Sequence, residues 1–205
     1  MNIQTQIESI FDGKSFKRPL FYNYEGGLRL ELSEGGNYLN QFLTAHRKGM
    51  EVCTQIFEGC EEITVCIRVG GEKSLLSCLS TLKSLREAGL YPTSGKEHWT
   101  EFDDEWVGDE DYADSLWHFI AFKAPFENLI NASWCAFSSD FGYIEPSAVV
   151  DVFLFNLDRE VMVFPYDDRG IDIVGPNHQF LKELYNKFDH YLLGYDRDAM
   201  DAAFS

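Results

Sequence analysis

The stretch VFPYDDRGIDIVG, at residues 163–175, holds the side chains whose types and spacing could do chemistry. Three carboxylates and one arginine stand between two apolar runs: Asp167, Asp168, Arg169 and Asp172. Paired carboxylates could act as general acid and general base, or hold a divalent metal ion such as Mg²⁺. Consecutive residues of an extended chain point to opposite faces, so Asp167 and Asp168 converge only if the chain turns between them.

A structural turn explains the same residues without any chemistry. Pro165 removes a hydrogen-bond donor and is expected to end the first strand. Aspartate side chains cap turns, and Gly170 is expected to adopt a positive φ. Arg169 can pair with Asp172 or with a carboxylate on a neighbouring helix. A calcium loop of the EF-hand type is excluded, because the glycine comes too early and His178 stands where the twelfth residue, a glutamate, is needed.

A second acidic phrase, YDRD at residues 195–198, begins the last predicted helix, where Asp196 is a natural N-cap. Together the two phrases predict a structural network that joins the C-terminal elements: Asp167, Asp168, Arg169, Asp172, Asp196 and Arg197. Its expected centre is a buried ion network of the two arginines with Asp172 and Asp196. Such a network acts more as a specificity device than as a source of net stability.

Residues 96–114, KEHWTEFDDEWVGDEDYAD, form an acidic, aromatic segment with nine carboxylates and no basic residue after the first. One interpretation is a solvated loop whose aromatic rings pack into the core. The other is a binding surface, because tryptophans are dominant anchors at interfaces and carboxylates around them steer a basic partner. The candidate partner-binding residues are Trp99, Glu101, Asp103, Asp104, Glu105, Trp106, Asp109, Glu110 and Asp111.

Other motifs that carry chemistry fail on spacing. The phrase GLYPTSGKE, at 89–97, has five residues between its glycines where a phosphate loop has four, and Glu97 replaces the required Ser or Thr. The five histidines show neither H-x-x-x-H nor H-E-x-x-H spacing. Cys135 could pair with His118 as a thiolate nucleophile, but a lone cysteine in an apolar helix is typical of a core. We therefore expect no catalytic residue, no metal and no cofactor.

Composition and charge favour one well-packed domain with a protein partner. The chain has 205 residues, of which 45% are hydrophobic, enough for a core. Its net charge of −17 repels nucleic acid and anionic lipid and attracts a basic protein, so neither nucleic acid nor membrane is an expected partner. No apolar run is long enough for a membrane span, and the N-terminus lacks a secretory pattern. Five cysteines without C-x-x-C spacing indicate reduced thiols, hence a cytoplasmic location.

Hydrophobic periodicity predicts a single α+β domain over residues 1–205, with helices packed on a largely antiparallel sheet. Helices are predicted at 2–11, 37–57, 72–89, 126–139, 177–196 and 197–204. Strands are predicted at 63–70 and 115–124, and as a pair about a turn within 148–168. A hairpin that turns at Gly26 and Gly27 is predicted within 18–36.

Three blocks resemble an uncharacterised bacterial family, one of the domain-of-unknown-function families. They are RPLFYNYEGGLRLELSEG near the start, VFPYDDRGIDIVG, and LYNKFDHYLLGYDRDAMDAAF near the end. Members carry an early Pro-Leu-Phe-Tyr-Asn-like segment and an Arg-x-Glu-Leu-like strand, and close with Tyr-Asp-Asp-Arg-Gly-x-Asp and Tyr-Asp-Arg. The resemblance supplies no catalytic residue. By analogy, the general character of the family is similar to that of small cytoplasmic partners of bacterial toxins.

The expected function is therefore that of a cytoplasmic immunity protein, antitoxin-like in action. It would bind and block a cognate basic toxin, of the nuclease type, through an acidic surface. Two alternatives stay open. One is a metal-dependent hydrolase that uses Asp167, Asp168 and Asp172, and the other is a non-catalytic scaffold whose acidic segment is only solvated.

Overall fold

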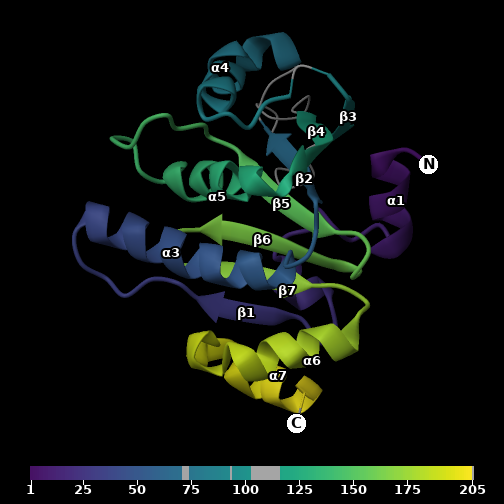
Figure 1. The fold of residues 1–205 in the computed structure, drawn as a ribbon, viewed down its shortest axis with the longest axis vertical. Coiled ribbons are helices and arrows are strands. Elements are labelled where there is room, and N and C mark those ends of the chain that lie inside the picture. The colour runs from purple at the N-terminus through teal and green to yellow at the C-terminus, as the bar shows by residue number, and fades with distance from the viewer. Residues whose placement is uncertain (71–73, 93, 103–115, 205) are drawn as a thin grey trace.

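A seven-stranded antiparallel sheet forms the centre of the structure, which is a computed structural model (Figure 1). The structure describes residues 1–70, 74–92, 94–102 and 116–204. The strands lie in the order β1 (Leu28–Glu31), β7 (Gly170–Val174), β6 (Val161–Asp167), β5 (Asp151–Asn156), β2 (Glu62–Val69), β4 (Leu116–Pro125) and β3 (Lys96–Phe102). The fold is α+β, as the sequence predicts.

Helices cover the sheet and its ends (Figure 1). They are α1 (Ile3–Ile10), α2 (Leu20–Asn23), α3 (Tyr38–Ile56), α4 (Leu79–Glu87), α5 (Leu129–Ser138), α6 (His178–Lys187) and α7 (Arg197–Phe204). Short 3₁₀ turns lie at Leu75–Cys78, Phe126–Asn128, Asp189–Tyr191 and Gly194–Asp196. Among the described residues, no helix combines the length and the apolarity needed to cross a membrane.

The sheet is buried on both faces, which explains why its central strand reads as a continuous apolar run. Along β2, Val65 and Ile67 belong to the core cluster that α3 and α5 complete. Cys66, between them, points to the opposite face and joins a second cluster with residues of α1. Because successive side chains of a strand alternate, each face of β2 needs its own apolar cover.

Most predicted elements are confirmed, including the long helix α3 and the hairpin of β5 and β6. The predicted hairpin within 18–36 is wrong. Its first arm is the short helix α2, and its second arm, β1, pairs with the distant strand β7. The acidic segment at 96–114 was expected to be a loop, but it begins as strand β3. The predicted helix at 177–196 ends at Lys187, and short 3₁₀ turns follow it.

Helices α3 and α5 approach each other closely at Gly49. A Cβ atom built on Gly49 would lie 2.6 Å from two ring carbons of Phe137, a side chain of α5 that is fully buried. The ring has no free space into which it could move. Glycine is therefore required at this position by packing, although it is a poor residue for the middle of a helix.

We predict that Gly49→Ala lowers the free energy of unfolding by about 1–3 kcal/mol, the usual cost of overpacking a core. The same substitution at an unobstructed helix position would stabilise by up to about 1 kcal/mol. Gly142→Ala is the control, because no atom lies within 4 Å of the added Cβ and its φ is not positive. Chemical denaturation measures both, and a stabilised Gly49→Ala variant would contradict the close packing.

Candidate functional site

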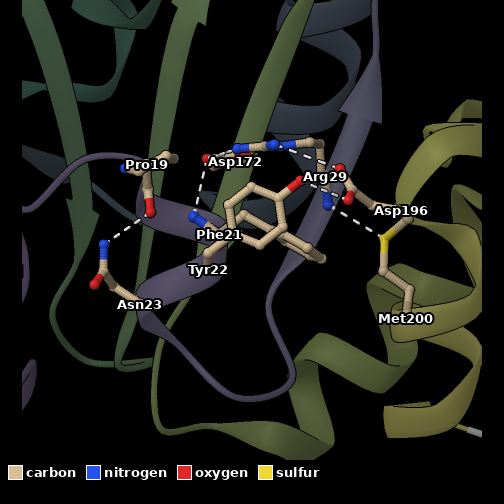
Figure 2. Close-up of polar contacts among 8 residues, drawn as sticks. All are labelled: Pro19, Phe21, Tyr22, Asn23, Arg29, Asp172, Asp196 and Met200. Carbon is tan, nitrogen blue, oxygen red and sulfur yellow. Dashed lines mark hydrogen bonds and ion pairs between the residues drawn. The ribbon is translucent and has the colours of Figure 1, made fainter.

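Arg29 on β1 is the centre of a buried ionic cluster (Figure 2). Its Nε–H and Nη2–H groups donate to the two carboxylate oxygens of Asp172, at 2.7 and 2.9 Å. Its Nη1–H group reaches Asp196 Oδ2 at 3.4 Å. The exposed fractions of the three side chains are 13%, 2% and 6%. One guanidinium thus holds one carboxylate with two bonds, the strong geometry for such pairs, and also contacts a second carboxylate.

Neighbouring groups supply further hydrogen bonds to the two carboxylates of the cluster. The backbone N–H of Phe21 donates to Asp172 Oδ2 at 3.0 Å, and the hydroxyl of Tyr22 donates to Asp196 Oδ1 at 2.7 Å. The rings of Phe21 and Tyr22 lie 5.1 and 4.9 Å from the guanidinium carbon, a distance suited to cation–π contact. Helix α2, strands β1 and β7 and the start of the C-terminal helix therefore meet at Arg29 (Figure 2).

Burial and charge act in opposite directions within this cluster. Burial raises the pKa of Asp172 above its ordinary value, although Arg29 acts to lower it. Burial alone would lower the pKa of Arg29, but the hydrogen bond and the charge of Asp172 reverse that effect and raise it. The guanidinium therefore stays charged and holds the carboxylates in place. The strong donors and acceptors of the cluster already have partners, which indicates a structural role.

The structure separates the residues of the predicted network into several ion pairs. It brings Asp172 and Asp196 together, but through Arg29 instead of Arg169 or Arg197. Arg169 is exposed and pairs with Asp167, two residues earlier in the chain. Arg197 pairs with Asp189 at 2.5 Å and with Asp201 at 2.7 Å.

Asp196, expected as an N-cap, accepts from Tyr22 and Arg29. The expected buried ion network therefore has a different cation, contributed by a strand about 140 residues away in the sequence.

The Asp167–Gly170 turn is built differently from the expectation. Gly170 does not have a positive φ. Glycine is needed there for space, because an added Cβ would lie 1.9 Å from the hydroxyl oxygen of Tyr166 and 2.9 Å from a backbone oxygen of β1. Pro165 does not end its strand either. It lies inside β6 next to a shift in register, where a missing donor is tolerated.

In and near this turn, the folded structure disfavours the charged forms of two carboxyl groups, those of Asp168 and Asp140. Burial raises the pKa of Asp168, and the charge of Asp167 raises it further. Burial likewise raises the pKa of Asp140, with smaller contributions from Asp167 and Asp168. These groups repel one another and do not surround a common point. Among the described residues, no group of three or more His, Cys, Asp or Glu side chains is placed to share a metal ion.

Strand β3 carries the described part of the acidic, aromatic segment. Trp99 is not an exposed anchor, because its ring stacks on Phe119 at 5.2 Å and its indole N–H donates to Glu101 at 3.1 Å. The carboxylate of Glu97 accepts from the first two backbone N–H groups of α1 and so fixes that helix against the strand. Glu101 and Phe102 are exposed. The other predicted partner-binding residues, Asp103, Asp104, Glu105, Trp106, Asp109, Glu110 and Asp111, lie outside the described residues.

A cleft of about 830 Å³ opens beside this strand, and Glu101 and Phe102 form part of its lining. Arg68, which also lines the cleft and is buried, donates to Asp151 at 2.7 Å and lies 4.1 Å from the centre of the Trp117 ring. Arg18 binds the same carboxylate. Charges of both signs line the cleft, so its described part has no strong preference for an anion.

Two further candidates for chemistry have ordinary structural roles. Cys135 is buried in α5, and burial raises the pKa of its thiol to about 12, which opposes a thiolate nucleophile. The Nε2 of His98 lies 3.3 Å from the Nδ1 of His118, with ring centres 5.5 Å apart and ring planes 12° apart. These values place the rings side by side in nearly one plane. One of these two nitrogens can therefore carry a hydrogen and donate it to the other, so the pair does not converge on a shared metal ion.

Comparison with known families identifies the chain. A family model described as "Domain of unknown function (DUF3885)" matches residues 3–196. The chain belongs to the DUF3885 family. The predicted membership of an uncharacterised domain family is thereby confirmed. Neither the curated proteins nor the solved structures gave a match. In this DUF3885 chain, the residues around Arg29 come from the three blocks on which the resemblance was based.

Arg29 is missing from the predicted network because its partners are distant in the sequence. The signal that could have found it is a charged residue inside the apolar strand LRLEL, where alternation places it on a face that the fold buries. A buried arginine requires a buried carboxylate, and Asp172 sits in an equally apolar strand. Pairing these two residues would also have predicted that β1 lies beside β7.

We predict that Arg29→Met lowers the free energy of unfolding by about 3–5 kcal/mol, because it leaves two buried carboxylates without a cation. Arg169→Met is the matched control. Its own side chain is 74% exposed, so loss of its pair with the half-buried Asp167 should cost less than about 1 kcal/mol. Urea denaturation of both variants checks the difference. Equal losses would show that Arg29 is no more important to the fold than a surface arginine.

We predict that Asp168→Asn raises the melting temperature at pH 7. A raised carboxyl pKa means that the folded state binds the proton more tightly than the unfolded chain, so stability falls as pH rises from about 3.9 through the folded pKa. The gain should therefore shrink as pH falls below about 3.9, where the wild-type carboxyl is protonated in both states. Glu183→Gln, on the exposed side of α6, is the control. A lower melting temperature for Asp168→Asn at pH 7 would show that the carboxylate is needed.

Proposed function

We propose that this DUF3885 protein is a non-catalytic binding protein of the immunity, or antitoxin-like, type. It blocks a basic toxin, of the nuclease type, by occupying the toxin's active surface. The observation that carries the proposal is strand β3, which lies at the end of the sheet and exposes the first part of the acidic, aromatic segment.

Charge supports a basic partner. The net charge of −17 attracts a positive surface from a distance and raises the rate of encounter. A nuclease presents such a surface because its substrate is a polyanion. Carboxylates placed where phosphates would lie can therefore block it without any chemical step. The exposed ring of Phe102 adds apolar contact area beside these charged side chains.

The hydrolase alternative has less support from the geometry of its proposed residues. Asp172 is buried and bound by Arg29, and Asp167 is bound by Arg169. The remaining carboxylate, that of Asp168, has a pKa raised by burial and by a neighbouring charge. Three carboxylates with separate surroundings do not form the convergent set of oxygens that Mg²⁺ requires. The scaffold alternative predicts that the acidic segment has no specific partner.

We predict that the tagged protein captures one small basic protein from its native cells, retained at low salt and released at high salt. Electrostatic attraction between exposed charges is screened by salt, so this dependence is expected. The captured protein should have an activity, nucleic-acid cleavage in particular, that the purified DUF3885 protein abolishes at a one-to-one ratio. A captured protein whose activity is unaffected would contradict inhibition.

Neutralising Asp103→Asn, Asp104→Asn and Glu105→Gln together should weaken binding of that partner at least tenfold, which corresponds to about 1.4 kcal/mol. The matched control removes the same charge at three exposed sites on other elements, with Glu61→Gln, Glu183→Gln and Asp198→Asn. Calorimetric titration compares the two variants. Equal weakening would show that only net charge matters, and unchanged affinity in the first variant would place the interface elsewhere.

A further inference from the structure

The two edges of the sheet differ in how the chain covers them. The outer edge of β1 is occupied by the C-terminal segment: Leu193 donates its N–H to the carbonyl of Arg29 at 2.9 Å, and Leu30 forms an antiparallel bridge with Leu192. Helices α6 and α7 lie alongside this edge (Figure 1). Protection of this kind is how soluble proteins prevent an edge strand from pairing with other chains.

The edge at β3 lacks such cover in the part of the chain that the structure describes. All seven residues of β3 are paired with β4, from Lys96 opposite Phe122 to Phe102 opposite Leu116. Within the described ranges, no segment other than β4 forms a backbone–backbone hydrogen bond with this strand. In an antiparallel strand, alternate residues direct their N–H and C=O groups away from the neighbouring strand. Among the described residues, the outer side of β3 therefore carries a row of backbone groups that can receive another strand.

Some side chains of β3 already serve the fold, and others are left for a partner. Glu97 caps α1, and Trp99 packs on Phe119, so these two side chains serve the fold. Lys96 turns back and donates to the carbonyl of Pro92 at 3.3 Å. The exposed groups left for a partner include the carboxylate of Glu101, one oxygen of which accepts from Trp99, and the ring of Phe102, which is 77% exposed.

Charge decides which strand this edge accepts. A second copy of the chain would bring a net charge of −17 against −17, and like charges across an interface cost affinity. A segment rich in lysine or arginine is attracted by the same charge. A basic side chain directly across from Glu101 forms a cross-strand pair of opposite charge, which is favourable. The negative charge of the chain therefore opposes self-association and favours a basic partner.

We propose that β3 takes up an extended, lysine- or arginine-containing segment of a protein partner as an eighth strand of the sheet. Main-chain hydrogen bonds supply the affinity of such strand addition, and side chains supply the specificity. Glu101 pairs with a basic side chain of the added strand, and Phe102 packs against an apolar one. This mode of binding rests on the proposed function and specifies how its acidic surface is used.

The test uses the full chain and a ten-residue peptide of alternating lysine and valine as the probe. A second peptide has the same sequence with every backbone nitrogen methylated, so it keeps the charge but cannot donate main-chain hydrogen bonds. Binding is measured by calorimetry at low salt, and hydrogen exchange of the β3 amides is followed by NMR. We expect the first peptide to bind at least tenfold more tightly and to slow exchange at alternate residues of β3.

Each other outcome has a separate meaning. If both peptides bind equally and exchange in β3 does not change, strand addition is wrong, whereas binding to an acidic surface stands. If neither peptide binds, strand addition is again wrong, and the capture experiment decides independently whether the protein has a basic partner. Glu101→Gln should weaken the first peptide, and Glu183→Gln, on the exposed side of α6, is its charge-matched control. Equal effects of the two variants would contradict a role for Glu101.

Discussion

The pair of Arg29 and Asp172 is the interaction on which the β1 end of the molecule depends. The two residues lie directly opposite each other in the ladder of β1 and β7. A shift of one residue in that register would move the guanidinium to the other face of the sheet, among aliphatic side chains. The ion pair therefore helps to fix the register of a strand only four residues long.

This register in turn positions the C-terminal segment. Once β1 is in place, its outer carbonyl at Arg29 and its side chain at Leu30 receive Leu193 and Leu192. The third bond of the guanidinium holds Asp196 just before α7 begins. A buried ion pair contributes little net stability compared with an apolar pair of similar size. Its value here lies in selecting one arrangement of four chain segments that are far apart in sequence.

The sequence predicts those parts of this structure that depend on local patterns. The helix α3 and the hairpin of β5 and β6 follow from periodicity over 10–20 neighbouring residues, and both are found. Helix α2 was predicted as a strand because its apolar residues read as β-rich, whereas its geometry depends on a hydrogen bond from Phe21 to Asp172, 151 residues later. The cation of the buried cluster was missed for the same reason. Pairing over such separations is a property of the fold as a whole: a charge inside an apolar strand signals that a buried partner is needed, but the local pattern does not say which residue it is.

The acidic character of the chain is divided between two environments with different consequences. The buried carboxylates around Arg29 share one guanidinium and have their oxygens bonded, so they contribute less to the field outside than exposed carboxylates do. The exposed carboxylates, such as Glu101 on β3, are solvated and keep their attraction for cations at a distance. On the proposed function, stability and recognition are carried by different acidic residues, near opposite edges of one sheet. A substitution at Arg29 is then expected to act on folding, whereas one at the β3 edge is expected to act on binding while the fold persists, so the two effects can be separated by experiment.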